Sequence, residues 1–237
     1  MMLFVHEVHE VVGRHEDEFE AAFRDGWMPT LTAGEDARLL WYMNHAHGSG
    51  ASYNVVTITG VRDGAAWERL AGRIQHGDLR EWSREVDTYR HDVTAKIMAP
   101  VHWSPIQEVD LATVPTDGRE HELHLFMEDT GWPTSSLDDY IQAWDDIYRQ
   151  PLLRYADDMR AIPIDIQACF QNVHGSSVRR EAMLWQYIPD PATVAHLLVT
   201  ELPLERRLPG TYMYDALAFR DQWKSRLLRT ASWSPLY

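Results

Sequence analysis

The chain has 237 residues, 45% of them apolar, which is enough for one large domain or two small ones. Its net charge of −14 disfavours binding to nucleic acid or to anionic membranes. No stretch approaches the roughly 20 apolar residues that span a bilayer. The first residues lack the basic region of a signal peptide, and Cys169 is a lone cysteine, so no disulfide framework is expected. We predict a soluble cytoplasmic protein.

The first half of the chain predicts the order strand, helix, strand, strand, helix, strand. Apolar residues alternate in the strands and recur at four-residue spacing in the helices, and Pro29 is expected to end the first helix. Glycines after His47 suit a hairpin turn. The predicted elements are strands 3–11, 38–46, 53–61 and 93–101, a helix over 15–25, and helices that begin at 63 and 78.

Three short sequences occur twice and in the same order, which indicates an internal duplication. They are His6–His9 with 121–124, His47–Gly50 with 174–177, and Trp103–Pro105 with 233–235. The second half accordingly predicts the same order of elements, with Pro151 ending its first helix. Its predicted elements are strands 120–127, 166–173, 180–187 and 223–230, a helix that begins at 136, and helical stretches from 194 and over 212–219.

Each half therefore predicts an α+β, ferredoxin-like repeat (βαββαβ) with helices on only one face of its antiparallel sheet. The bare faces of the two sheets can pack against each other, which would give a barrel-like pseudo-dimer within one chain. We place the first repeat at 1–105, a linker at 106–119 and the second repeat at 120–237.

Several segments resemble a known family. The opening His6–Glu10 stands where a tyrosine-glutamate-leucine-arginine sequence is usual, Asn54–Thr59 resembles the third strand, and Ile97–Pro100 with Trp103–Pro105 resembles the closing strand. The chain is thus similar to a tandem NIPSNAP-like member of the dimeric α/β-barrel (ferredoxin-like) superfamily. The resemblance implies the fold. Relatives in that superfamily include heme-binding enzymes, cofactor-free oxygenases, isomerases, lyases and proteins with no assigned chemistry.

The paired His-Glu-x-His sequences are the first candidate site. Residues two apart on a strand share a face, so Glu7 points with His9 and Glu122 with His124. If that face lies between the sheets, the four side chains would meet and could bind a divalent metal such as zinc, iron or manganese. They could equally transfer protons without a metal, or form a purely structural pair of buried hydrogen bonds.

A second cluster lies on the strands that flank the hairpin turn. We predict His45 as a further catalytic residue. Side chains on the same or matching strands are predicted to contact a ligand: Trp41, Met43, Asn54, Phe170 and Glu181.

These features favour an enzyme that acts on a small apolar or aromatic molecule, by lyase, isomerase or oxygenase chemistry. Two alternatives remain open: a non-catalytic module that binds a ligand or heme, and a NIPSNAP-like interaction protein. We also expect a homo-oligomer, because sheet edges and many tryptophans would otherwise be uncovered.

Overall fold

A computed structural model of the chain describes residues 1–154, 164–175, 179–199, 201 and 203–237. The strands are β1 Leu3–Val11, β2 Ala37–His45, β3 Asn54–Val61, β4 Arg90–Pro100, β5 Leu125–Pro133, β6 Asp165–His174, β7 Ala182–Ile188 and β8 Arg220–Thr230. The first half also contains η1 Gly13–His15, α1 Glu16–Ala21, η2 Ala22–Trp27, α2 Met28–Leu31, α3 Gly64–His76 and α4 Arg80–Thr88. The second half contains α5 Leu137–Trp144, η3 Asp145–Arg149, α6 Gln150–Arg154, α7 Pro191–Val199, η4 Leu204–Arg207, α8 Tyr212–Asp215 and η5 Ala216–Ala218.

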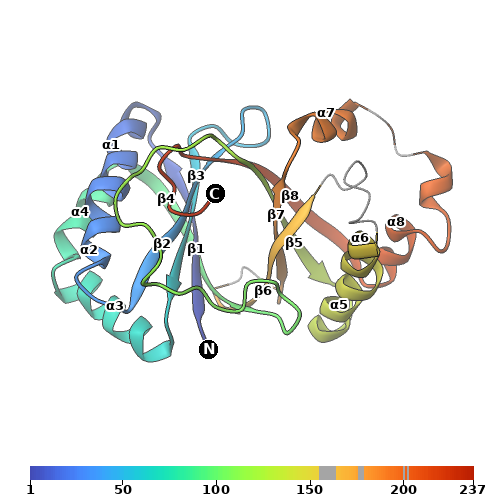
Figure 1. Cartoon of the computed structure of the whole chain (residues 1–237), viewed down its shortest axis with the longest axis horizontal. Helices are drawn as coiled ribbons and strands as arrows, with labels where there is room; N and C mark the ends of the chain where they lie inside the picture. Colours follow the sequence, from blue (N-terminus) through green and yellow to red (C-terminus); the bar gives the residue numbers. More distant parts are fainter. Residues whose placement is uncertain (155–163, 176–178, 200, 202) are drawn as a thin grey trace.

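The strands form one closed antiparallel barrel, in the order β1-β3-β2-β8-β5-β7-β6-β4. Figure 1 shows this barrel between two groups of helices, α1–α4 on one side and α5–α8 on the other. The predicted α+β class and barrel-like core are confirmed. Each half contributes four neighbouring strands in the same relative order, and β2/β8 and β4/β6 join the two sets. Closure pairs every strand of the barrel on both sides, so exposed edges no longer argue for an oligomer.

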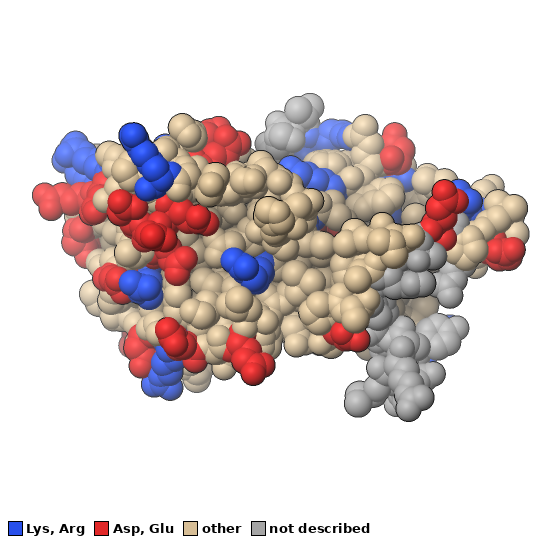
Figure 2. All heavy atoms as spheres, turned by 90° about the horizontal axis from the view of Figure 1, so that it is seen from above, with Lys and Arg blue, Asp and Glu red and all other residues tan. Residues whose placement is uncertain are grey.

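The interior of the barrel is apolar toward one end and polar toward the other. Phe4, Trp41, Phe126 and Trp185 belong to the apolar cluster, and the interstrand segment after β4 closes this end with the buried side chain of Leu111. The barrel is therefore packed at one end and hollow at the other. Seen from above, acidic side chains gather over the half that carries α1–α4 (Figure 2).

The first helix of each half continues through its proline, so the predicted ends at Pro29 and Pro151 are wrong. In both halves an α-helix passes through a short π-helix (η2 or η3) into a second α-helix that contains the proline. A proline has no N–H to donate and crowds the preceding turn. Each of these prolines is the second residue of the α-helix that follows the wider π-helical turn. Such π-helical turns are frequent at functional sites.

The second strand set begins later than the sequence repeat predicts. Strand β5 starts at Leu125, so the predicted strand 120–127 is wrong over its first five residues. Phe4 pairs with Met98 on β4, and Phe126 holds the same position against Leu228 on β8. The residue of β5 that corresponds to His6 of β1 is consequently Glu128. The second His-Glu-x-His sequence precedes the strand, and its resemblance to the first is not structural.

Among the described residues, the helices are all too short or too polar to cross a membrane.

Candidate functional site

Strand β1 presents the predicted residues to two different places. Alternate side chains of a strand point to opposite faces. Glu7 and His9 lie on the outer face, under helices α1–α4, whereas His6 and Glu10 lie on the inner face, in the barrel. The expectation that the Glu7/His9 face lies between the sheets is therefore wrong. Two cavities follow, which we call the helix–sheet pocket and the barrel-end cavity.

The helix–sheet pocket is a largely apolar space of about 120 Å³. Trp27 of η2 stacks on Trp82 of α4 with 4.5 Å between ring centroids, and Phe23 packs edge-on against Trp82. The indole N–H of Trp82 donates to the Ala22 carbonyl at the start of the π-helix, at 2.7 Å. The pocket is lined by Val5, Glu7, Phe23, Trp27, Thr59, Trp67, Leu70, Ile74, Trp82, Ser83 and Arg90.

A chain of hydrogen bonds leads from the floor of this pocket into the sheet. Thr57 of β3, the cross-strand partner of Glu7, hydrogen-bonds the Glu7 carboxyl. His9 Nε2 lies 3.0 Å from Thr57 Oγ1, and His9 Nδ1 lies 2.9 Å from Nη1 of Arg90. Since Arg90 can only donate, Nδ1 accepts and Nε2 donates to the threonine hydroxyl, which leaves that hydroxyl free to donate to Glu7.

Burial sets the protonation of this chain. It raises the pKa of Glu7, against the opposing effects of Arg90 and the Thr57 hydrogen bond. It lowers the pKa of His9 well below the usual value, and Arg90 lowers it further. A neutral His9 has one donor and one acceptor nitrogen, as the hydrogen bonds require. Among the groups joined by these hydrogen bonds, Glu7 is therefore best suited to exchange a proton with a ligand in the pocket.

The second half of the chain has a buried acid and an arginine at the positions that match Glu7 and Arg90. Different side chains form the hydrogen bonds around this acid. Asp129 is the fifth residue of β5, as Glu7 is of β1, and Arg220 opens β8 as Arg90 opens β4. Burial raises the pKa of Asp129. Its carboxyl accepts from Gln186 at 3.0 Å, and Gln186 in turn accepts from the Tyr148 hydroxyl at 2.8 Å. An amide and a phenol thus replace the threonine and histidine of the first half.

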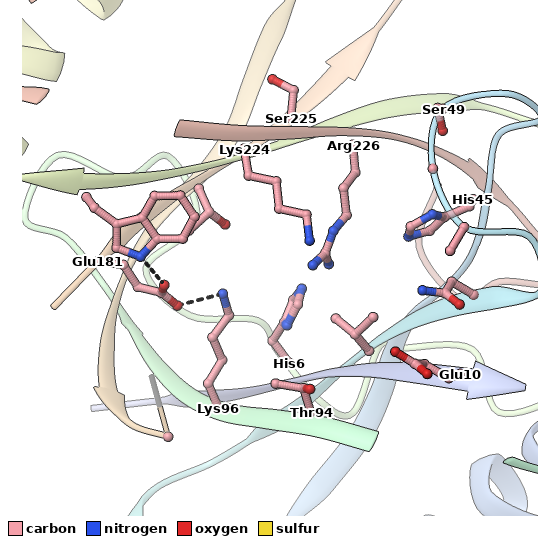
Figure 3. Close-up of a pocket in the computed structure, with 17 residues that line it drawn as sticks. His6, Glu10, His45, Ser49, Thr94, Lys96, Glu181, Lys224, Ser225 and Arg226 are labelled. Carbon is pink, nitrogen blue, oxygen red and sulfur yellow. Dashed lines mark hydrogen bonds and ion pairs between the residues drawn. The ribbon is translucent and has the colours of Figure 1, made fainter. Parts of the chain in front are cut away.

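The barrel-end cavity has a volume of about 380 Å³ and charged walls (Figure 3). It brings together three predicted residues, His45, Asn54 and Glu181. Glu181 binds Lys96 Nζ at 2.8 Å and accepts from the Trp132 indole at 3.0 Å. The other residues that line the cavity are His6, Val8, Glu10, Ser49, Gly50, Ala51, Thr94, Thr130, Gly175, Lys224, Ser225 and Arg226.

A buried ion pair lies at the inner side of this cavity. Glu128 Oε2 accepts from Nε2 of His6 at 2.7 Å, and Glu128 Oε1 lies 3.2 Å from Arg226 Nη1. Burial opposes ionisation of Glu128, but His6, Arg226 and Lys96 outweigh it, so its pKa lies well below the usual value. Burial lowers the pKa of His6 in spite of Glu128. Glu128 is thus a carboxylate that accepts from a neutral imidazole.

His45 should make stability depend on pH. Burial, and then Arg226, lower its pKa from 6.5 to about 4. The unfolded chain binds the proton more readily, so His45 stabilises the folded state above pH 6.5 and this contribution is lost as pH falls toward 4. Asparagine stands at the matching position in the second half, Asn172. We therefore expect His45→Asn to weaken the pH dependence of the free energy of unfolding. Urea unfolding across this range measures it, and an unchanged pH dependence would refute this role of His45.

The remaining predicted residues do not share a site. Trp41, Met43 and Phe170 are part of the apolar core of the barrel. Glu122 is exposed ahead of β5, and His124 packs against the rings of Tyr187 and Tyr237.

The metal site predicted from Glu7, His9, Glu122 and His124 is wrong. In the described part of the chain, no group of three or more His, Cys, Asp or Glu side chains is placed to hold a metal ion. Neither His9 nor His45 suits the iron of a heme, since a histidine ligand needs a free ring nitrogen beside an apolar slot. His9 adjoins aromatic rings but has both nitrogens hydrogen-bonded, and His45 has free nitrogens but faces charged walls.

Sequence reasoning missed the groups that complete both sites. Thr57 and Arg90 join Glu7 through strand pairing, which the sequence does not display. The sequence did contain a signal for the barrel-end cavity. The chain has only two lysines, Lys96 and Lys224, and each lies at an inward-facing position on the last strand of its half, β4 or β8.

Structural comparison relates the whole chain to known folds. A candidate monooxygenase from Lactobacillus acidophilus NCFM matches with a TM-score of 0.58 at 10% identity, covering 99% of this chain and 98% of that one. An anthrone oxidase-like protein matches with a TM-score of 0.55 at 9% identity, covering 97% and 91%. A NIPSNAP family protein from Agrobacterium tumefaciens aligns over 45% of this chain and 99% of its own, with a TM-score of 0.37 at 14% identity.

At 10% identity or less, the likeness to the first two of these neighbours shows that this chain shares their overall fold. No protein-family model matches the sequence, and the search of curated proteins gives no match.

Proposed function

We propose that the protein is an enzyme that binds a small, largely apolar aromatic molecule in the helix–sheet pocket and exchanges a proton with it through Glu7. The observation that carries this proposal is a carboxyl of raised pKa at the end of a hydrogen-bond chain, facing a pocket of tryptophan and phenylalanine rings. A carboxyl whose pKa is raised can both accept and donate a proton. The volume of about 120 Å³ suits a single ring, since a cavity of about 150 Å³ binds benzene.

The residues around Glu7 have separate parts in this proposal. The rings of Trp27, Trp82 and Phe23 hold the ligand and exclude water. Glu7 removes a proton from an acidic O–H or C–H group of the ligand. The Arg90 guanidinium lines the pocket and stabilises the negative charge left on the ligand. His9 and Thr57 act as positioning residues, because their hydrogen bonds orient the carboxyl.

Proton removal is a first step common to isomerases, lyases and oxygenases. Two full-length neighbours are described as a candidate monooxygenase and an anthrone oxidase-like protein. We therefore favour oxidation: the deprotonated carbon of the ligand gives its electron pair to dioxygen and forms a C–O bond. The resulting peroxide takes back the proton held by Glu7, and the hydroperoxide then loses water to leave a carbonyl group. Simple phenols and the single-ring ketone phenylacetone are suitable first probes, because each fits the volume of one ring and has an acidic proton next to it.

Intrinsic tryptophan fluorescence tests occupancy of the pocket. Phenol should change the emission of the wild type, since Trp27, Trp67 and Trp82 line the pocket. Ser83→Phe places a ring in the same space without touching the hydrogen-bond chain, and should weaken phenol binding at least tenfold. Ser135→Phe, at an exposed position, is the control and should bind as the wild type does. Equal binding by the Ser83 variant would place the ligand elsewhere.

A non-catalytic ligand-binding protein is the second candidate. The observation that favours it is the hydrogen bond from Thr57 to the Glu7 carboxyl. This bond satisfies a buried acid and needs no catalytic role to explain it. Binding of phenols and phenylacetone without oxygen uptake, and without exchange of the acidic C–H of phenylacetone, would support this alternative over the enzyme.

We also propose that the two strand sets are tandem ferredoxin-like repeats, 1–105 and 120–237, joined by 106–119 and packed as a pseudo-dimer. Their equal strand order and their matching π-helical turns support this. Self-association and a cytoplasmic location stay predictions, and light scattering measures the first.

A further inference from the structure

The barrel-end cavity gathers positive charge in a chain that is otherwise acidic. Both lysines of the sequence, Lys96 and Lys224, line it together with Arg226. Figure 3 shows the three side chains reaching into the same space from β4 and β8, with His6 and His45 facing it. Like charges in a shared cavity repel one another unless an anion lies between them.

Two acids at this cavity are already engaged. Glu181 is paired with Lys96, and Glu128 with His6 and Arg226. Lys224 has no acidic partner within 4.0 Å among the described residues, and Glu10 lies exposed on β1. Arg226, and then burial, lower the pKa of Lys224. One cation is therefore left unpaired beside another.

Several buried polar atoms around the same space have no hydrogen-bond partner among the described residues. They are His6 Nδ1, both ring nitrogens of His45, and Nε of Arg226, whose Nη1 is already held by Glu128. His6 is only 1% exposed. Buried groups of this kind are normally satisfied, and four such atoms around one cavity point to a bound molecule.

We propose that the barrel-end cavity binds a small organic oxyanion, a carboxylate or a phosphate ester that also carries a hydroxyl group. Arg226 and Lys224 supply donors for the oxyanion. His6 donates from Nε2 to Glu128, so its free Nδ1 is an acceptor, and a hydroxyl is the ligand group that would donate to it. The volume of about 380 Å³ falls within the range of small-molecule sites. This site is separate from the helix–sheet pocket and does not depend on the function proposed there.

Calorimetric titration at low ionic strength tests the site directly. The probes are malate, succinate, which lacks the hydroxyl, and glycerol 3-phosphate. We expect malate or glycerol 3-phosphate to bind, and whichever binds more tightly identifies a carboxylate or a phosphate as the preferred group. Succinate should bind more weakly than malate. Failure of all three at millimolar concentration would overturn the proposal.

A charge variant separates the site from general attraction. Lys224→Met keeps most of the side-chain length at an exposed strand position, so it should fold, and it should weaken binding by about 10- to 100-fold. Arg80→Gln removes one exposed positive charge outside the cavity and should bind as the wild type does. Equal affinities for the Lys224→Met variant and the wild type would overturn the proposal.

Lysine acetylation gives a second readout that needs no activity. Acetic anhydride should modify Lys224 faster than Lys96, because Lys224 is exposed and unpaired whereas Lys96 is buried against Glu181. Saturating anion should slow the acetylation of Lys224, as measured by peptide mass spectrometry. Acetylation at the same rate with and without anion would count against the site.

Discussion

Replacing Glu7 with glutamine should abolish most proton exchange with phenolic or ketonic ligands while leaving the protein folded. Glutamine has the same shape but cannot take up a proton at neutral pH. General acid–base catalysis typically contributes about 10²- to 10⁴-fold to a rate, so we expect a loss of that order. The measurement is oxygen uptake with phenols or phenylacetone, or hydrogen–deuterium exchange at the acidic C–H of phenylacetone.

The stability of the same variant separates catalysis from scaffolding. Burial raises the pKa of Glu7, so removing its charge should leave the free energy of unfolding unchanged or slightly higher. Glu68→Gln, on the exposed face of α3, makes the same charge change away from the pocket and should behave as the wild type. Full turnover by the Glu7 variant would remove the acid–base role.

The second large effect concerns stability. Glu128→Leu should lower the free energy of unfolding by about 3–5 kcal/mol, the usual cost of removing one partner from a buried ion pair. Leucine leaves Arg226 without its nearest acid and the His6 Nε2–H without an acceptor. Water compensates poorly for either loss, because the side chain of Arg226 is only 14% exposed and that of His6 only 1%. Urea unfolding measures the change.

Two further variants make this prediction specific. Glu128→Gln keeps an oxygen for His6 and should lose less than Glu128→Leu. Glu122→Leu makes the same chemical change at an exposed position and should shift stability by no more than about 0.5 kcal/mol. A Glu128→Leu variant as stable as the Glu122 variant would show that the buried pair contributes nothing.

Local patterns in the sequence predicted the strands well, because alternation and periodicity depend on near neighbours. The range 3–11 agrees fully with β1, and the hairpin strands lie within a residue or two of their predicted positions. The same local reasoning failed at Pro29, where a π-helical turn lets the helix continue.

The site was harder to predict because it depends on which face of a strand meets which layer. Alternation correctly placed Glu7 and His9 together, but it does not say whether helices or the second sheet cover that face. The matching of His-Glu-x-His sequences then put Glu122 and His124 in the wrong register. Thr57 and Arg90 reach Glu7 only through pairing with distant strands.

The pair formed by His6 and Glu128 has a consequence for how such barrels evolve. The two residues hold matching positions on β1 and β5, yet they are different and complementary. A barrel assembled from two identical subunits must set like against like on its symmetry axis, imidazole against imidazole or acid against acid. A single covalent chain escapes that constraint, so each side of the axis can diverge until the centre carries a polarity that no symmetric assembly could have.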